Sequence, residues 1–170
     1  MAKILVVGGS LGGLFVANIL LRQGHDITLL EKATGSLDGR GAGIVTHDAL
    51  AQALKAAGVT VDHTLGVPVS QRVTLGQDGN TLGEMELPQI LTSWSRLYHM
   101  LKESFPAEHY LQGKAVKSLT QDTNSVRVQC EDGSQYEAEL LIASDGIRSG
   151  VRAQVAPEVQ PEYAGYIAWR

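Results

Sequence analysis

Apolar runs near the start of the chain alternate with glycine and polar residues in an order that predicts two strands and a helix. Residues 3–7 (Lys-Ile-Leu-Val-Val) form a β-branched apolar run of the kind that is buried on both faces of a sheet. Residues 10–23 carry leucine and alanine at helical spacing, Gly24 ends this helix, and residues 26–30 form the second strand before Glu31. This order predicts a βαβ unit with parallel strands and a right-handed crossover.

Two further helices are expected along the chain. Asp48 stands where it would cap a helix over residues 49–57. A later helix begins after a cap at Thr92 or Ser93 and ends at the Phe-Pro pair of residues 105–106, because the residue before a proline disfavours helical geometry.

The remaining apolar stretches are typical of strands. Residues 65–87 predict an antiparallel hairpin around an Asp-Gly-Asn turn, and residues 126–130 with 135–139 predict a second hairpin. Residues 110–112 fit a short strand, and residues 140–143 (Leu-Leu-Ile-Ala) are apolar enough for a central one. The predicted fold class is therefore α/β: a Rossmann-like domain with a parallel sheet and an antiparallel β-hairpin crossover.

Composition narrows the class of protein. With 44% hydrophobic and 19% charged residues among 170, the chain is too apolar to be disordered and long enough for one domain with a sizeable core. The formal net charge of −4 offers no basic surface for nucleic acid. The single cysteine, Cys130, excludes an internal disulfide, and no His/Cys group has metal-ligand spacing. We therefore expect a cytoplasmic protein that binds neither nucleic acid nor a metal ion.

The uncharged stretch from Ile4 to Leu21 raises the question of a membrane span or an export signal. Glycines interrupt this stretch early, Asn18 stands late in it, and no small-residue cleavage site follows. Because patterned glycines explain the stretch better, we expect no membrane association.

The sequence Gly8-Gly9-Ser10-Leu11-Gly12-Gly13 stands between the first strand and the first helix, in the frame G-x-S-x-x-G. In a dinucleotide-binding turn the first glycine permits the bend, a small second residue lets the backbone approach a pyrophosphate, and the third lets the helix pack on the strand. Ser10 fills the second position and offers its hydroxyl to a phosphate. The N–H groups of the first helical turn face the same anion.

Glu31 ends the second strand, 18 residues beyond Gly13. A carboxylate at this point accepts hydrogen bonds from the ribose of an adenosine, and its charge disfavours a 2′-phosphate. The alternative is an ordinary glycine-rich turn followed by a solvated strand end. The combination of strand, turn, helix and acid favours the dinucleotide site.

A second candidate site follows the strand at residues 140–143. Asp145 and Gly146 come directly after it, at the carboxyl end, where open α/β sheets bind ligands. Asp145 suits a ribityl or ribose hydroxyl, Gly146 lets the chain pass close by, and Arg148 and Arg152 suit a phosphate or an acidic neighbour. Taken alone, Asp-Gly is an ordinary turn.

Together these motifs resemble those of the FAD-dependent aromatic hydroxylases, the class A flavoprotein monooxygenases with the p-hydroxybenzoate hydroxylase fold. The glycine turn with Glu31 is similar to their first motif, and Asp145-Gly146 followed by Ser-x-Val-Arg is similar to their middle motif. Residues 6–10, 43–45 and 163–170 are most similar to the dihydroxypyridine hydroxylase subgroup.

The resemblance implies FAD as the cofactor and adds residues to the candidate site. Gly43 and Ile44 belong to a segment that resembles the family's glycine loop near the flavin. Arg40 of the same loop is expected near the isoalloxazine, and the alternative is a solvated loop arginine. Val116 ends a segment that resembles the one whose backbone meets the adenine. Lys32 replaces the commoner arginine after the acid and keeps only a point charge.

Some features depart from the family pattern. Trp94 stands where many members carry an arginine against the flavin, so a charge is lost there. The third FAD motif, a Gly-Asp with Ala and His, has no match. We therefore expect residues 1–156 to be an incomplete FAD-binding domain and residues 157–170 to begin a substrate domain in a partial chain. His47 fits a loop or helix-cap residue better than a proton shuttle.

The resemblance implies an NAD(P)H-dependent monooxygenase. NADH or NADPH would reduce FAD, O2 would add as a flavin C4a-hydroperoxide, and an electron-rich ring, here a hydroxylated N-heteroaromatic one, would receive the hydroxyl group. A homodimer is considered, and no catalytic acid or base is assigned. The alternative is a non-catalytic or truncated Rossmann-type module that binds FAD or ADP-like ligands. An NAD-dependent dehydrogenase is disfavoured because it requires neither the hairpin crossover nor the Asp-Gly segment.

Overall fold

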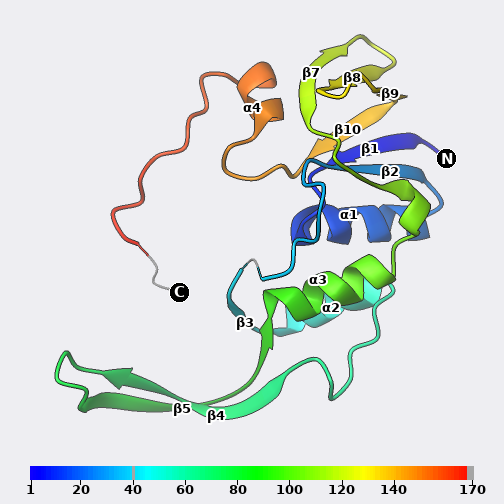
Figure 1. Cartoon of the computed structure of the whole chain (residues 1–170). Coiled ribbons are helices and arrows are strands. Elements are labelled where there is room, and N and C mark those ends of the chain that lie inside the picture. The colour runs from blue at the N-terminus through cyan, green and yellow to red at the C-terminus, as the bar shows by residue number, and fades with distance from the viewer. Residues whose placement is uncertain (40, 168–170) are drawn as a thin grey trace.

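The computed structural model describes residues 1–39 and 41–167. Figure 1 shows a central parallel sheet between a layer of helices and a small antiparallel sheet, with a long hairpin reaching away from these layers. Within the described residues the central sheet has four parallel strands in the order β10-β1-β2-β6. Their bounds are Lys3–Val7 for β1, Asp26–Glu31 for β2, Tyr110–Gln112 for β6 and Leu140–Ala143 for β10.

Helices cover one face of the parallel sheet: α1 (Leu11–Arg22), α3 (Trp94–Glu103) and, beyond them, α2 (Asp48–Ala56). Alternate sheet residues such as Ile4 and Val6 form the larger apolar core with helix residues that include Leu14 and Leu101. The buried Asn18 amide joins two helices, since it donates to the carbonyl oxygens of Leu14 and Leu101, both at 2.9 Å. The first helix is therefore fixed against both the sheet and α3.

The antiparallel sheet of β7 (Val116–Gln121), β8 (Val126–Cys130) and β9 (Gln135–Ala138) covers the opposite face. Its buried residues Val128, Cys130 and Ala138 form a second core with Leu5 of β1 and Leu30 of β2, which point away from the helices. Burial on both faces explains why β1 and β2 are continuous apolar runs. Cys130 is buried in this core, as expected for a small apolar residue.

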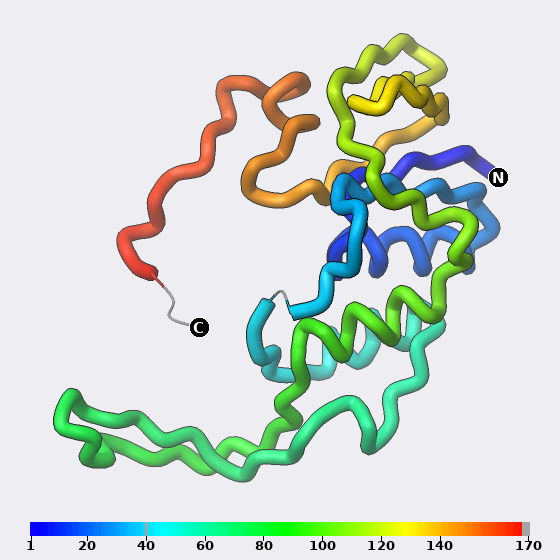
Figure 2. The backbone as a smooth tube through the Cα atoms, viewed as in Figure 1, coloured from blue at the N-terminus to red at the C-terminus, as the bar shows by residue number. Residues whose placement is uncertain are grey.

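The hairpin consists of β4 (Val67–Leu75) and β5 (Thr81–Ser93), and β3 (Gly43–Val45) pairs with the last three residues of β5. It leaves Val67, Leu75 and Leu82 largely exposed. A short 3-10 helix η1 (Ala107–His109) precedes β6, and α4 (Gly150–Val155) follows β10. Figure 2 follows the chain from α4 into a tail without regular structure up to residue 167.

Among the described residues the predicted elements are present, with four additions and one correction. Strands β3 and β7, helix α4 and the 3-10 helix η1 were not predicted, because each is short and lacks a strong periodicity. Asp48 does not cap α2; His47 does, since its Nδ1 accepts from the Leu50 N–H at 3.2 Å, and Asp48 is the first helical residue. His47 is thus a helix-cap histidine, and Ser93 is the cap of α3. In the ranges 1–39 and 41–167, the longest apolar helices fall short of what a membrane crossing needs.

Candidate functional site

The carboxyl ends of three parallel strands meet beside the glycine turn. Val7 lies opposite Leu30 of β2 on one side and Ala143 of β10 on the other. The next strand along the chain, β2, lies on one side of β1, and the last strand, β10, lies on its other side. The strand order therefore reverses at β1, and the carboxyl ends of these strands form a topological switch point. Open α/β sheets bind ligands at such a point.

Two glycines make the turn possible. Gly8 has φ +106°, and a Cβ there would lie 2.4 Å from the Ser144 carbonyl oxygen. A Cβ on Gly13 would lie 1.8 Å from the Gly8 carbonyl oxygen. Both distances are far below van der Waals contact. Glycine is therefore required at position 8 for the close approach of the segment after β10, and at position 13 for the close approach of α1 to the end of β1.

The start of α1 leaves its N–H donors free. Ser10 is the N-cap, but its side chain makes no capping bond, and the first N–H to reach a helical carbonyl is that of Leu14, which donates to Ser10 at 3.0 Å. The N–H groups of residues 10–13 have no partner within the part of the chain that the structure describes. Together with the helix dipole, they form an environment that favours an anion.

Glu31 lies against this turn. Its Oε2 accepts from the Gly9 N–H at 2.7 Å and its Oε1 accepts from the Ala33 N–H at 2.8 Å, and the residue is only 6% exposed. Each carboxylate oxygen can accept a further hydrogen bond. The strand-end acid is therefore not a solvated side chain, as the alternative interpretation required, but part of the turn.

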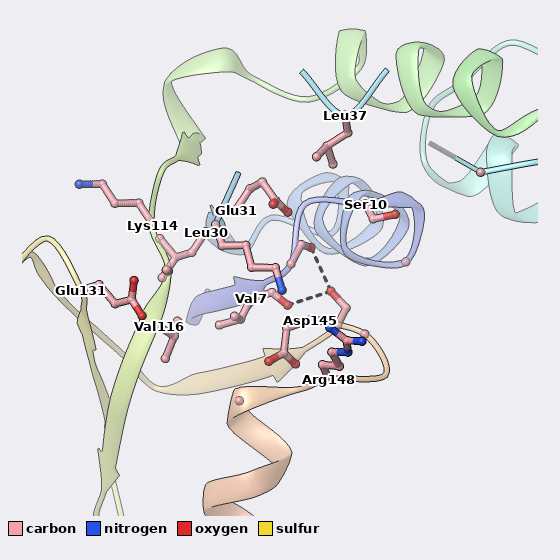
Figure 3. A pocket seen from close by; sticks show the side chains of 18 of the residues that line it. Val7, Ser10, Leu30, Glu31, Leu37, Lys114, Val116, Glu131, Asp145 and Arg148 are labelled. Carbon is pink, nitrogen blue, oxygen red and sulfur yellow. Dashed lines mark hydrogen bonds between the residues drawn. The ribbon is translucent and has the colours of Figure 1, made fainter. Parts of the chain in front are cut away.

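A pocket of about 570 Å³ opens over the turn and the strand ends. Figure 3 shows Ser10 and Glu31 on one side of it, Asp145 and Arg148 on another, and Lys114, Val116 and Glu131 at the far end. The lining residues come from the glycine turn, β2, the loop after it, the start of α3, the antiparallel sheet and the segment after β10. Segments far apart in the sequence thus form one cavity.

Eight predicted site residues line this pocket: Gly8, Ser10, Gly12, Glu31, Lys32, Val116, Asp145 and Gly146. Leu11 and the buried Gly13 belong to the turn without lining the pocket. Gly43 and Ile44 do not line it either; they form β3, which pairs with β5, and Ile44 packs on the larger core. Arg40 lies outside the described residues.

Asp145 is held by the helix that follows it. Its Oδ1 accepts from the Ser149 hydroxyl at 2.6 Å and its Oδ2 accepts from the Val151 N–H at 3.3 Å. Arg148 lines the pocket, whereas the Arg152 guanidinium donates to the Ile147 carbonyl oxygen at 2.5 Å and does not line it. The interaction of Arg152 is thus with a backbone carbonyl, not with a carboxylate.

Other lining residues received no individual role from the sequence, although Lys114 lies in the segment expected near the adenine and Trp94 stands at the position expected to face the flavin. Lys114 donates to Asp132 at 2.6 Å, which raises the pKa of the lysine and holds the pKa of the Asp132 carboxyl well below its usual range. Glu131 lies beside Lys114 because β7 and β8 adjoin, which no local pattern indicates. Trp94 lines the pocket and stacks on Tyr98, with ring centroids 4.9 Å apart, so much of its ring surface packs on protein.

Comparisons with known proteins agree with this arrangement. The chain matches a family model described as an FAD binding domain over residues 1–168. It is 35% identical over 169 residues to 2,6-dihydroxypyridine 3-monooxygenase of Paenarthrobacter nicotinovorans. This alignment covers 99% of this chain and 42% of the relative. It is 32% identical over 183 residues to 3-amino-4-hydroxybenzoate 2-monooxygenase of Streptomyces cremeus, with 99% of this chain and 45% of the relative covered.

A solved structure is equally similar. The structure of 2,6-dihydroxypyridine-3-hydroxylase from Arthrobacter nicotinovorans superposes with a TM-score of 0.86 at 34% identity, covering 96% of this chain and 42% of that one. The chain thus spans less than half the length of the relatives it matches. The glycine turn, the acid of β2 and the Asp-Gly segment after β10 lie within the matched region, and the chain belongs to the FAD-binding domain family.

Proposed function

We propose that the pocket over the glycine turn holds FAD, with the adenosine diphosphate part of the cofactor on the first helix. The observation that carries this proposal is the Gly9 N–H bond to the buried Glu31 carboxylate, next to four N–H groups at the start of α1 that have no partner among residues 1–39 and 41–167. The unpartnered donors suit phosphate oxygens, and the free lone pairs of Glu31 suit ribose hydroxyls. A volume of about 570 Å³ lies in the range of cofactor sites.

The other lining residues divide between two ends of the proposed site. Val116 and its neighbours at the antiparallel sheet suit the adenine, and Lys32 offers a positive charge beside Glu31. Asp145 and Gly146, across the strand ends, suit the ribityl or flavin part of the cofactor. The short bond from Ser149 fixes the Asp145 carboxylate while leaving it acceptor capacity for a cofactor hydroxyl.

We propose that the protein carrying this chain is an NAD(P)H-dependent monooxygenase of a hydroxylated N-heteroaromatic ring. Two relatives, 2,6-dihydroxypyridine 3-monooxygenase and 6-hydroxynicotinate 3-monooxygenase of Pseudomonas fluorescens, support this substrate class by the rings for which they are named. When bound, the flavin supplies the redox and oxygen chemistry of hydroxylation. The residues of this chain bind the cofactor, orient it and exclude water from its phosphates.

The expected domain division belongs to the same proposal. Residues 1–156 form the layered Rossmann-like unit, and residues 157–170 would begin a substrate domain. The tail is without regular structure through residue 167 and exposes Tyr163, Tyr166 and Ile167 by 76%, 75% and 66%, as a segment that packs on another domain would. Trp169 and Arg170 lie outside the described residues. The cytoplasmic location and the homodimer stay predictions.

The proposal is tested by colour and turnover. The purified protein is expected to retain or take up FAD, and NADH or NADPH oxidation should rise when 2,6-dihydroxypyridine is added. The product should gain one oxygen atom, detected by mass spectrometry. Stimulated oxidation without an oxygenated product would contradict hydroxylation, whereas flavin binding without any oxidation would favour the non-catalytic nucleotide-binding module.

A further inference from the structure

Both peptide groups of Gly9 are held by buried side chains. The Gly9 N–H donates to Glu31 Oε2 at 2.7 Å, and the Gly9 carbonyl oxygen accepts from the Tyr110 hydroxyl at 2.9 Å. Tyr110 comes from the start of β6, 101 positions along the chain, and does not line the pocket. The turn is thus fixed from behind by a residue that no ligand in the pocket would touch.

The surroundings of Tyr110 keep its hydroxyl protonated and in place. The residue is 8% exposed, its hydroxyl lies 3.4 Å from that of Tyr98, and Lys102 Nζ lies 4.9 Å from its ring centroid. Burial, followed by the bond to Tyr98, raises the pKa of the Tyr110 phenol above its ordinary value. The phenol therefore stays a hydrogen-bond donor at neutral pH.

The bond to Gly9 has a geometric consequence for the next residue. In a trans peptide the carbonyl and the N–H point in opposite directions, and the described residues contain no cis peptide. Because the Gly9 carbonyl points to the buried Tyr110, the Ser10 N–H points the other way, and Ser10 lines the pocket. A Cβ on Gly9 would lie 2.3 Å from the Tyr110 oxygen, so the contact also requires glycine here.

We propose that Tyr110 is a positioning residue for the phosphate-binding turn: by holding the Gly9 carbonyl, it presents the Ser10 N–H to the phosphates of the bound dinucleotide. This inference rests on the proposed function. Without the hydroxyl, the Gly9–Ser10 peptide is free to rotate, and part of the binding free energy is then spent on ordering it. The effect should therefore fall on ligands that carry phosphate and spare those that do not.

The test compares Tyr110→Phe with Ser104→Ala, which also removes a hydroxyl that donates to a backbone carbonyl, that of Ala57 at 3.3 Å, but contacts neither Tyr110 nor the turn. Flavin-free protein is titrated calorimetrically with FAD, ADP and adenosine, and folding is checked by thermal melting. We expect Tyr110→Phe to raise the Kd of FAD and ADP by about tenfold, the effect of one lost hydrogen bond, and to leave the Kd of adenosine unchanged. Ser104→Ala should leave all three values unchanged.

Other outcomes are decisive as well. An unchanged Kd for ADP in Tyr110→Phe, or an equal loss for ADP and adenosine, would overturn the positioning role while leaving FAD binding intact. Failure of the unmodified protein to bind FAD and ADP would instead overturn the proposed function itself. Tyr110→Met also lacks the hydroxyl and fills the site with a flexible side chain, so it must show the same selective loss of phosphate ligands.

Discussion

Replacing Glu31 by glutamine tests the core of the proposed site. The substitution keeps the size of the side chain and removes its charge. In the native protein the carboxylate accepts from the Gly9 N–H at 2.7 Å and the Ala33 N–H at 2.8 Å. A glutamine has one oxygen for these two donors, so its amide NH2 must face the other N–H.

The structure gives the size of the effect. One charge-assisted hydrogen bond is lost and one N–H is left unpaired at a residue that is 6% exposed, which should lower the free energy of unfolding by about 2–3 kcal/mol. For a chain of 170 residues this corresponds to a melting temperature lower by about 4–12 °C. The loss of the charged acceptor for the ribose should weaken FAD binding by about ten- to a hundredfold.

Glu139→Gln is the matched control. Glu139 also accepts from a backbone N–H, that of Lys3 at 2.8 Å, but it is exposed and precedes β10, at the opposite end of the sheet from the pocket. Thermal melting with and without FAD, together with quenching of flavin fluorescence on binding, measures both variants. The control should bind FAD like the unmodified protein. If Glu31→Gln also binds FAD with unchanged affinity, the ribose role of Glu31 is refuted.

Three further predictions concern the turn and its neighbours. Gly13→Ala should abolish folding or FAD binding because its Cβ would lie 1.8 Å from the Gly8 carbonyl oxygen. Gly12→Ala should keep the melting temperature, because its Cβ meets nothing closer than 3.9 Å. Equal melting temperatures of the two variants would contradict this prediction. Ser144→Ala removes the hydroxyl that donates to the carbonyl oxygens of Val7 and Gly8, both at 3.0 Å. It should lower the melting temperature, measured by calorimetry, by about 2–4 °C. An unchanged melting temperature would argue against these hydrogen bonds. Because the pKa of Tyr110 is raised in the folded protein, its protonated phenol stabilises the fold at pH values below 10.0, the ordinary tyrosine pKa, and this stability is lost as the pH rises above that value. Tyr110→Phe should therefore flatten the fall in melting temperature at alkaline pH. An identical fall in both proteins would contradict the raised pKa.

Much of the site could be predicted because it depends on local patterns and on one topological rule. The apolar run of β1, the glycines and the acid after β2 all belong to one βαβ unit, whose geometry brings Glu31 to the turn. Asp145 could be predicted beside them because the carboxyl ends of parallel strands share one edge of the sheet. These inferences require no knowledge of how distant segments pack.

The remaining features depend on such packing. Lys114 and Glu131 reach the pocket only because the antiparallel sheet covers the parallel one, and Tyr110 reaches Gly9 across 101 positions of sequence. His47 replaces Asp48 as a cap because the backbone enters α2 one residue earlier than the commoner capping residue suggests. Gly43 and Ile44 pair with β5, since the long return strand of the hairpin extends to the start of α3.

The most direct measurement is a calorimetric titration of the flavin-free protein with FAD and, separately, with FMN. The two flavins share the isoalloxazine, the ribityl chain and one phosphate, but only FAD has the adenylate that Glu31 and the N-terminus of α1 would hold. We expect one FAD to bind per chain and FMN to bind far more weakly. Equal affinity for FMN, or no binding of FAD, would contradict it.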